Sequence, residues 1–454
     1  MMQYRPSRLT AFVTLALTWL LSGCGETSLP TASGEGAIRG INGIVTAPDL
    51  NFLIEERTLD PVTYQGVSGF RDWDDLEYTV NFDYLPPGGA DSVRVASQFI
   101  DVVANMEYTV VVTGSIANPS VVFWESEERV WDGTETFFEI DFAHLSPTLG
   151  QVDVYYELVG ELPAVGNEVA TLSFGDRIPH VQFENGDYVL YLTAPGDPTT
   201  VLYESIVIIG STQQRTTIGL FDPDPSKTAP VGVTLFSQVG ASQTLADTRF
   251  PPQLRVLHAS IDTVNVDGYL DENLATLVYP NIAFKGLSQY EEAPDGVTPL
   301  TLTEAGNSAN VVYEVQLSRF LNTRRTQALI EVADALLTRP LEDQGRPLET
   351  YPVVRITHLS KNVDAIDIYE VDPGTVIDET VFPKFLGIQT GLSTEFFATN
   401  SAGMREFVLT LFLDQEPIAT SLVLDLQAGD YVDIAILDTA DPAVLELHVF
   451  DSNL

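Results

Sequence analysis

The stretch LRVLHASIDTVNVDGYL, residues 254–270, decides the fold, because related stretches lie on either side of it in the chain. VRITHLSKNVDAIDIYE follows at 354–370, and IDFAHLSPTLGQVDVYY precedes at 140–156. In each copy, a histidine is followed by serine after two residues, aspartate after nine and tyrosine after eleven. Self-similarity at a fixed period indicates tandem structural repeats. The signature residues are His144, Ser146, Asp153 and Tyr155; His258, Ser260, Asp267 and Tyr269; and His358, Ser360, Asp367 and Tyr369.

A degenerate fourth copy lies near the start of the chain, with Asn42 at the histidine position and Asn51 at the aspartate position. The copies are spaced by 102, 114 and 100 residues, which is the size of an immunoglobulin-like sandwich. We therefore predict an all-β fold of tandem immunoglobulin-like β-sandwich modules. Their predicted bounds are 37–136 for the degenerate repeat, then 137–250, 251–351 and 352–454.

One segment conflicts with this pattern. TQALIEVADALL, residues 326–337, has the composition and spacing of a helix. The repeat alignment instead pairs its first half with segments of the other copies that are predicted strands. We predict a strand for the first half, and a short helix remains possible in the second half.

Strand periodicity suggests what the repeated histidine does. Alternate residues of a strand face the same side, and His258 ends a row of apolar residues that face the core. We expect its ring to hydrogen-bond loop backbone groups that would otherwise be buried without a partner. Asn42 can do the same in the first module, because an amide both donates and accepts.

The aspartate and tyrosine lie on the next strand, and the same periodicity puts them on its outward row. Asp267 and Tyr269 alternate with Val266, which faces inward. The signature histidine and aspartate would then face opposite sides, which argues against a shared metal site, as does the lack of a second histidine at ligand spacing. Hydrolysis by serine, histidine and aspartate lacks a G-x-S-x-G elbow and would need three sites in series. We predict no catalytic residues, no metal and no cofactor, and a structural role for the signature.

The charge of the chain excludes one class of partner. There are 64 acidic and 22 basic residues, a net charge of −42, so the chain is not expected to bind nucleic acid. The acidity suits a solvated surface or adaptation to salt water. Calcium capture by the acidic loops FDPDPS and RDWDD is a weaker alternative, since neither has the spacing of a calcium loop.

The first residues predict export. Arg5 and Arg8 precede the apolar run LTAFVTLALTWLL, which is short for a membrane span and typical of a secretory signal, residues 1–23. LSGC, ending at Cys24, resembles the lipobox of bacterial lipoproteins. The resemblance implies cleavage before Cys24, lipidation of this single cysteine and, because Gly25 follows it, the outer membrane. A flexible tether is predicted at 24–36.

The signature also carries a family resemblance. The pattern R-V-x-H-x-S followed by V-D-x-Y resembles the start of domain-of-unknown-function 4397 repeats, which occur in secreted and anchored bacterial proteins. The match is good for the copies around His258 and His358, fair around His144 and poor before Thr136. It implies β-sandwich modules outside the cytoplasm, and it implies no activity.

Two functions remain open from the sequence. The first is a non-enzymatic lipoprotein of the cell envelope, a row of four sandwiches forming a rod for adhesion, scaffolding or capture of a polymer. Its partners would be the membrane, through Cys24, and a surface polysaccharide or protein. The second is an extracytoplasmic protein that binds a small ligand or metal, with exposed Trp73, Trp124 and Trp131 building the site. Packing at edges and interfaces is the alternative role for these tryptophans.

Overall fold

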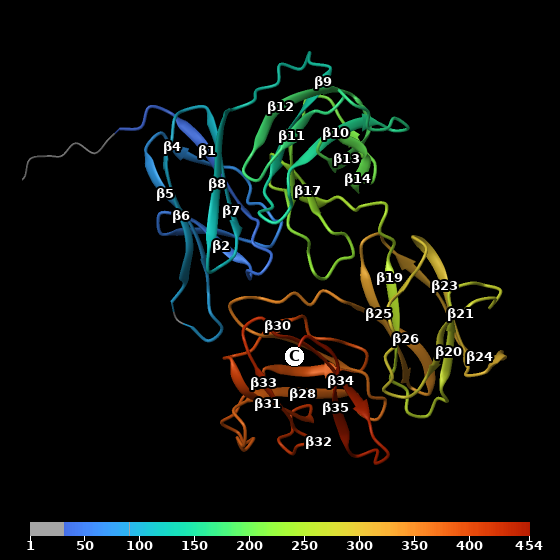
Figure 1. Ribbon diagram of the computed structural model, residues 1–454. Helices are drawn as coiled ribbons and strands as arrows, with labels where there is room; N and C mark the ends of the chain where they lie inside the picture. The colour runs from blue at the N-terminus through green and yellow to red at the C-terminus, as the bar shows by residue number, and fades with distance from the viewer. Residues whose placement is uncertain (1–30, 90) are drawn as a thin grey trace, which may run out of the picture.

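The structure, a computed structural model, describes residues 31–89 and 91–454. These residues form 35 strands and no helix, so none of the described segments is a helix able to cross a bilayer. The strands make eight sheets of four or five strands, two for each module, and the predicted all-β sandwich fold is confirmed (Figure 1). The leader, Cys24 and most of the predicted tether lie outside the described residues.

The first module shows the plan that the other three follow. One sheet has the order β4-β1-β7-β8 and the other has the order β3-β2-β5-β6. The first strand begins at Glu35, inside the predicted tether. The strands are β1 (Glu35–Asn42), β2 (Leu50–Ile54), β3 (Arg57–Val62), β4 (Arg71–Asp74), β5 (Glu77–Tyr84), β6 (Val93–Asp101), β7 (Met106–Gly114) and β8 (Pro119–Glu127).

The second module repeats this order and adds two short strands. Its sheets are β12-β9-β16-β17-β18 and β11-β10-β13-β14, with β15 also paired to β13. The strands are β9 (Phe137–His144), β10 (Val152–Leu158), β11 (Ala170–Leu172), β12 (Arg177–Glu184), β13 (Gly186–Ala194), β14 (Asp197–Glu204), β15 (Ile208–Gly210), β16 (Arg215–Phe221), β17 (Gly232–Ser237) and β18 (Ser242–Thr244).

The third and fourth modules keep the same connections. The third has sheets β22-β19-β25-β26 and β21-β20-β23-β24, and the fourth has β30-β27-β34-β35-β32 and β29-β28-β31-β33. The strands are β19 (Gln253–His258), β20 (Val266–Tyr269), β21 (Leu277–Ile282), β22 (Glu291–Glu292), β23 (Gly296–Glu304), β24 (Asn307–Arg319), β25 (Arg324–Val332), β26 (Ala335–Glu342), β27 (Val353–His358), β28 (Ala365–Val371), β29 (Phe385–Gln389), β30 (Phe397–Ala398), β31 (Gly403–Leu411), β32 (Ala419–Thr420), β33 (Leu422–Leu426), β34 (Tyr431–Asp438) and β35 (Leu445–Ser452).

The copies agree down to the register of one unusual pairing. The first strand of every module lies parallel to a strand near the end of the same module, whereas most other pairs are antiparallel. The signature position has an apolar partner each time: Asn42 pairs with Val112, His144 with Leu220, His258 with Leu329 and His358 with Ile436. The repeat seen in the sequence is therefore a repeat of topology.

The segment that resembled a helix is a hairpin. β25 and β26 are joined by Ala333 and Asp334, both with positive φ (50° and 62°), which is the backbone of a two-residue hairpin turn. Leu329 packs in the core of its own module, while Ile330 packs on the fourth module.

The strand predicted for the first half of 326–337 is confirmed. The possible helix in the second half is wrong, because Leu336 and Leu337 pack on opposite faces of β26, and a strand that packs on both faces loses its polar alternation.

The modules pack in pairs through the sheets that contain their first strands. Between the first and second modules lies an apolar cluster that includes Ile41, Trp124 and Phe221. An equivalent cluster between the third and fourth includes Leu257 and Ala435. The sequence predicted separate copies, but it held no indication of these shared faces.

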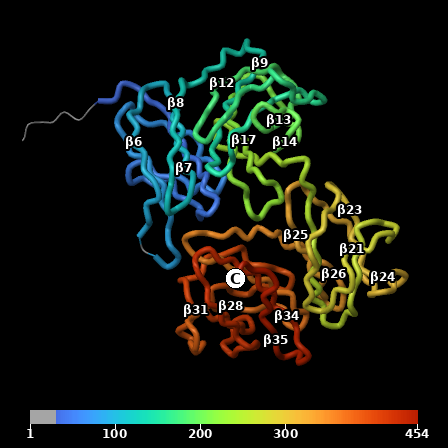
Figure 2. Tube along the Cα trace, viewed as in Figure 1, coloured from blue at the N-terminus to red at the C-terminus, as the bar shows by residue number. Residues whose placement is uncertain are grey.

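The four modules do not form a rod. Residues 343–352, which we call the strap, run from the third module to the fourth and lie against the first (Figures 1 and 2). The Glu349 carboxylate accepts hydrogen bonds from the Thr46 hydroxyl at 2.7 Å and from the Ile116 N–H at 3.0 Å. Asn322 joins the second and third modules through the backbone of Asp247, which accepts at 2.8 Å. The chain is thus closed on itself, because its fourth module returns to its first.

Candidate functional site

The structure places the three signature histidines at the ends of the module cores, all with 0% exposure. His144 Nε2–H donates to the carbonyl of Gly150, and His258 Nε2–H to that of Val264, both at 3.0 Å and both six residues on. Asn42 Nδ2–H reaches the equivalent carbonyl of Pro48 at 3.4 Å. In these modules the side chain therefore ties the loop after the first strand to the core.

Burial also decides the charge state of these rings. It lowers the pKa of His258, and it lowers the pKa of His358 to about 4, although the carboxylates of Asp438 and Asp364 oppose the shift. Both rings are neutral at neutral pH. A neutral ring donates through one nitrogen only, which suits His258 with its single carbonyl. Neither ring nitrogen of His358 has a hydrogen-bond partner among the described residues, so the expected bond to a loop carbonyl is not formed there.

The fourth module is expected to lose stability as the pH falls. The folded pKa of His358 lies near 4 and the unfolded value near 6.5, so its stabilising effect is complete above pH 6.5 and is lost down to pH 4. The loss should total about 3 kcal/mol. Urea unfolding between pH 7.5 and 4.5 measures it, with His358→Asn as the comparison because Asn42 fills this position naturally. Parallel pH profiles for the two proteins would refute the assignment.

The sequence indicated that the signature aspartates lie on the outward row of their strand. The structure shows that this row does not face solvent. Asp153, Asp267 and Asp367 are 3%, 5% and 1% exposed. Asp267 accepts hydrogen bonds from the N–H groups of Asn281 and Gly306, at 2.6 and 2.7 Å. The other two make the same kind of contact: Asp153 with Gly196 N at 2.6 Å and Thr171 Oγ1, and Asp367 with Gly387 N at 2.7 Å and Leu413 N at 2.9 Å.

The reason for this burial lies in the turns of the same sheet. Asn281, Gly306 and Leu413 all have positive φ, as do the other backbone donors, Gly196 and Gly387. The chain bends back over the outward face at these residues, and the carboxylate collects their N–H groups. Alternation placed the aspartates on the correct side of their strand, but that side is covered.

The tyrosines and serines of the signature are buried too. Tyr155, Tyr269 and Tyr369 share the outward row with the aspartates and are at most 7% exposed, because that row is covered. The Ser146 hydroxyl donates to Asp222 and the Ser360 hydroxyl to Asp438. Each carboxylate lies at the end of the strand that pairs in parallel with the first strand of its module. These hydroxyls bond carboxylates and not the histidine rings, which is not the geometry of a hydrolytic triad. Nor does any group of three metal-binding side chains occur within residues 31–89 and 91–454.

The tryptophans do not share a site. Trp124 is buried between the first two modules, with the Arg177 guanidinium 5.4 Å from its ring. Trp73 packs edge-on to Tyr78, and Trp131 lies under Arg129 at 4.0 Å. The expectation of exposed tryptophans in one binding site is therefore not met, and their contacts are those of packing. Of the remaining histidines, His180 and His448 are half-buried.

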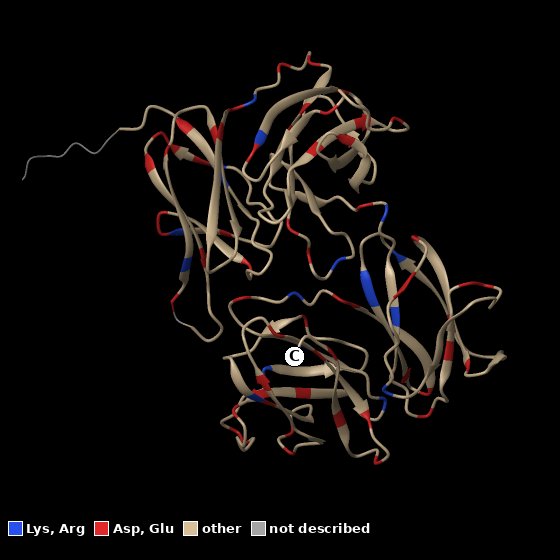
Figure 3. Ribbon diagram, in the orientation of Figure 1, with Lys and Arg blue, Asp and Glu red and all other residues tan. Residues whose placement is uncertain are grey.

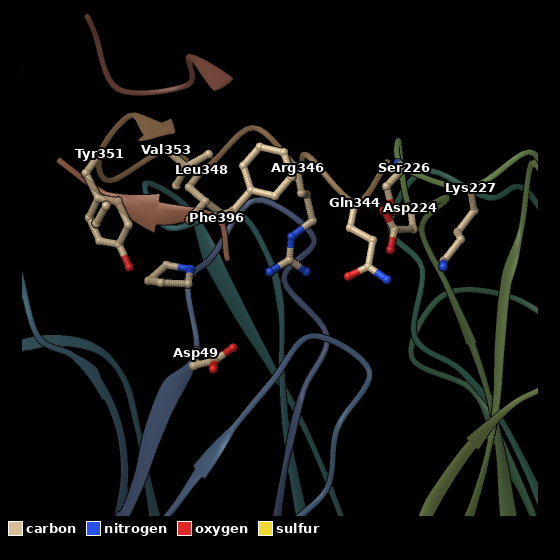
Figure 4. A pocket seen from close by; sticks show the side chains of 12 residues that line it. Asp49, Asp224, Ser226, Lys227, Gln344, Arg346, Leu348, Tyr351, Val353 and Phe396 are labelled. Carbon is tan, nitrogen blue, oxygen red and sulfur yellow. Dashed lines mark hydrogen bonds between the residues drawn. The ribbon is translucent and has the colours of Figure 1, made fainter. Parts of the chain in front are cut away.

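A pocket that no sequence motif indicated lies where three modules meet the strap (Figure 4). Its volume is 470 Å³, within the range of small-molecule sites. The polar ends of Tyr351, Arg346, Gln344 and Lys227 point to the same side, and Asp49 lies on that side (Figure 4). The lining residues are Pro48 and Asp49 of the first module, Asp224, Ser226 and Lys227 of the second, Gln344, Arg346, Leu348 and Tyr351 of the strap, and Val353, Phe396 and Ala398 of the fourth.

A protein-family model matches the chain twice, over residues 36–155 and 252–369. The matched family is described as a domain of unknown function, DUF4397, and the two matches together cover more than half of the chain. The chain belongs to this family. Each match begins at the start of a module and ends at a signature tyrosine of the next, Tyr155 or Tyr369. A DUF4397 match therefore spans one sandwich and the first two strands of the sandwich packed on it.

Each family match includes parts of two modules that pack on each other, and an arginine of the repeated pattern lies at that packing. The sequence did not suggest this role for the arginine. Three residues before the signature position stand Arg39, Arg255 and Arg355, on the first strands that face the neighbouring module. Within the fourth module, Arg355 Nε and Nη2 donate to the two carboxylate oxygens of Asp433, both at 2.6 Å, and Nη1 donates to the Glu342 carbonyl of the third module. Arg255 Nη2 donates to Asp451 of the fourth module at 2.6 Å. The third and fourth modules are thus joined by charged hydrogen bonds from both arginines.

The first pair has its own version of this network. Arg39 Nη2 crosses the interface to the Thr217 hydroxyl at 3.0 Å. Asp141 replaces the arginine in the second module, where it accepts from Arg177 at 2.7 Å and from the His180 N–H at 2.7 Å. Burial raises the pKa of Asp141, but these hydrogen bonds outweigh it and hold the pKa at about 2. Asp141 is therefore ionised at neutral pH.

The other comparisons add little to the DUF4397 assignment. No curated protein matches the chain. Among solved structures, the product complex of SpuA, a multi-modular glycogen-degrading pneumococcal virulence factor, is similar at 9% identity with a TM-score of 0.15. The similarity covers 60% of this chain and 37% of that one, so the chain spans well under half of its length.

Proposed function

We propose that the chain is a non-enzymatic, lipid-anchored protein of the cell envelope that binds and holds a partner as one closed, four-module unit. The observation that carries the proposal is the use of the repeated polar residues. His144 and His258 hold loop carbonyls, the signature aspartates hold turn N–H groups, and arginine joins modules. The groups that the repeat conserves between its own copies are occupied in holding the fold.

The closed arrangement of the four modules favours binding of a partner by a broad surface over binding at a distance from the membrane by an extended rod. Aspartate and glutamate residues occur in all four modules (Figure 3), and the chain carries a net charge of −42. Such a surface repels nucleic acid and anionic membranes and keeps the unit soluble around its attachment point. The partner in this proposal is a surface polysaccharide or a protein.

The anchor is tested by fractionation and protease shaving of intact cells. The wild-type chain is expected in the outer-membrane fraction, and Cys24→Ala is expected in the soluble extracytoplasmic fraction. Multiple acyl chains on one residue make that difference nearly complete. Protease added to intact cells then distinguishes a unit that faces outward from one that faces the periplasm. A wild-type chain that fractionates like Cys24→Ala would refute the anchor.

The second candidate, a binding protein for a small ligand, is favoured by the pocket at the strap. Pockets of this size with aromatic walls and a few converging polar groups are typical binding sites. Its chemistry is narrow enough to name a class of ligand.

A further inference from the structure

The pocket at the strap combines opposite charges that are not paired with each other. Arg346 and Lys227 supply two cations, and Asp49 and Asp224 supply two carboxylates. Among the described residues, none of these four takes part in a salt bridge, although shorter-range pairs hold many other charges of the chain. The formal charge of the lining is therefore balanced. Asp224 Oδ1 accepts from the N–H and the hydroxyl of Ser226, at 2.9 and 2.8 Å, whereas Asp49 and the Lys227 amine make no side-chain hydrogen bond within the described residues and are open to a ligand.

Arg346 is fixed beside the pocket by contacts with the first module. One of its nitrogens, Nη2, donates to the Ala47 carbonyl at 3.0 Å, and its guanidinium lies 5.1 Å from the ring of Tyr64. Burial lowers its pKa, and the nearby carboxylates of Asp224 and Asp49 oppose the shift. No other hydrogen bond of its guanidinium occurs within the described residues. The remaining N–H groups are thus available beside the pocket.

The apolar part of the lining is rigid. Phe396 is held by the Arg355 guanidinium, 4.8 Å from its ring centre, and Arg355 is itself fixed by Asp433. Leu348 of the strap is buried, and Pro48 lies across the pocket on the first module. A ligand would therefore meet a firm apolar wall beside a row of polar ends (Figure 4).

These features select for a neutral ligand with many hydroxyl groups. A hydroxyl donates to Asp49 or Asp224 and accepts from Arg346 or Lys227, whereas an anion meets two carboxylates and a cation meets two basic groups. The C–H face of a sugar ring suits an apolar wall of the kind formed by Phe396. We propose that this pocket binds an uncharged saccharide unit, held between the strap and the first, second and fourth modules. The inference rests on the binding role proposed above and is independent of the anchor.

Calorimetry on the full chain purified in detergent tests the proposal. The probes are cellohexaose, maltohexaose and chitohexaose, with hexagalacturonate as the anionic control and the chitosan hexamer as the cationic control. At least one neutral hexamer is expected to bind with a Kd between micromolar and millimolar, and about tenfold or more tighter than both charged hexamers. Glucose and N-acetylglucosamine are run beside the hexamers. Affinity that rises with length indicates a polymer, equal affinity indicates a free sugar, and both support the site.

Two variants of lining residues test whether the heat of binding arises at the pocket. Asp49→Asn and Lys227→Gln change side chains that make no side-chain hydrogen bond to the described protein, so both should fold normally and weaken binding about fivefold or more. Asp295→Asn, an exposed acid outside the pocket, is the matched control and should bind as the wild type does. The proposal is overturned by folded protein that gives no heat with any neutral hexamer, by tighter binding of a charged hexamer, or by binding that survives the Asp49→Asn/Lys227→Gln double variant. The same outcomes leave the anchor unaffected, because fractionation of Cys24→Ala does not depend on them.

Discussion

Replacing Arg355 with methionine is expected to lower the free energy of unfolding of the C-terminal pair of modules by about 3–5 kcal/mol. The Arg355 side chain is 7% exposed and its partner Asp433 is 2% exposed. Arg355 also reaches the Asp343 carboxylate at 3.4 Å. Without the guanidinium, buried carboxylates lose their main compensating charge, and the cost of leaving a charge buried alone exceeds the worth of the pair itself.

Urea unfolding of the wild type and two further variants measures this effect. Arg71→Met removes a surface pair with Asp60, whose side chains are 54% and 40% exposed, and should cost at most about 1 kcal/mol. Arg355→Met/Asp433→Leu removes both charges of the buried pair and should recover part of the loss. Equal costs for Arg355→Met and Arg71→Met would show that the interface does not depend on this charge.

Replacing Asp267 with alanine should destabilise the third module by about 2–4 kcal/mol. The change leaves the N–H groups of Asn281 and Gly306 without their acceptor, and hydrogen bonds to a charged group are the stronger kind. Asp267→Asn keeps one acceptor oxygen, so its loss of stability should be about half of the loss in Asp267→Ala. Both turns also have positive φ, so they have little to stabilise them once the carboxylate is gone.

Chemical denaturation and amide hydrogen exchange test this prediction together. Exchange at Asn281 and Gly306 should accelerate in Asp267→Ala before exchange in the core strands does. Asp295→Ala, an exposed acid of the same module, is the control and should change stability by less than about 0.5 kcal/mol. If Asp267→Ala resembles this control, the carboxylate does not hold the turns.

Much of the fold could be read from the residues themselves. The spacing of His144, His258 and His358, with Asn42 in the degenerate copy, gave the number of modules, and alternation gave the strands on either side of the signature loop. Both signals are local, because a strand shows its own periodicity wherever it lies. They were ambiguous at Leu336 and Leu337, which pack on opposite faces of one strand, so no polar alternation marks it as a strand.

The candidate site could not be read in the same way. The pocket joins residues as distant in the chain as Asp49, Lys227 and Tyr351, and none of them lies in the repeated signature. The strap that carries Tyr351 reads as an ordinary connection between two copies. Its place depends on contacts such as that of Glu349 with Thr46, which no periodicity encodes.

The sequence by itself determined that one all-β unit is repeated, and which side of each strand its polar residues occupy. Only the tertiary structure decided what covers those sides: turns over Asp267, a neighbouring module over Arg355 and the strap over Asp49. The physical reason is that alternation reports the two faces of a strand within its own sheet. The burial, charge and partners of a residue depend on segments that are far away in the chain and packed against that face.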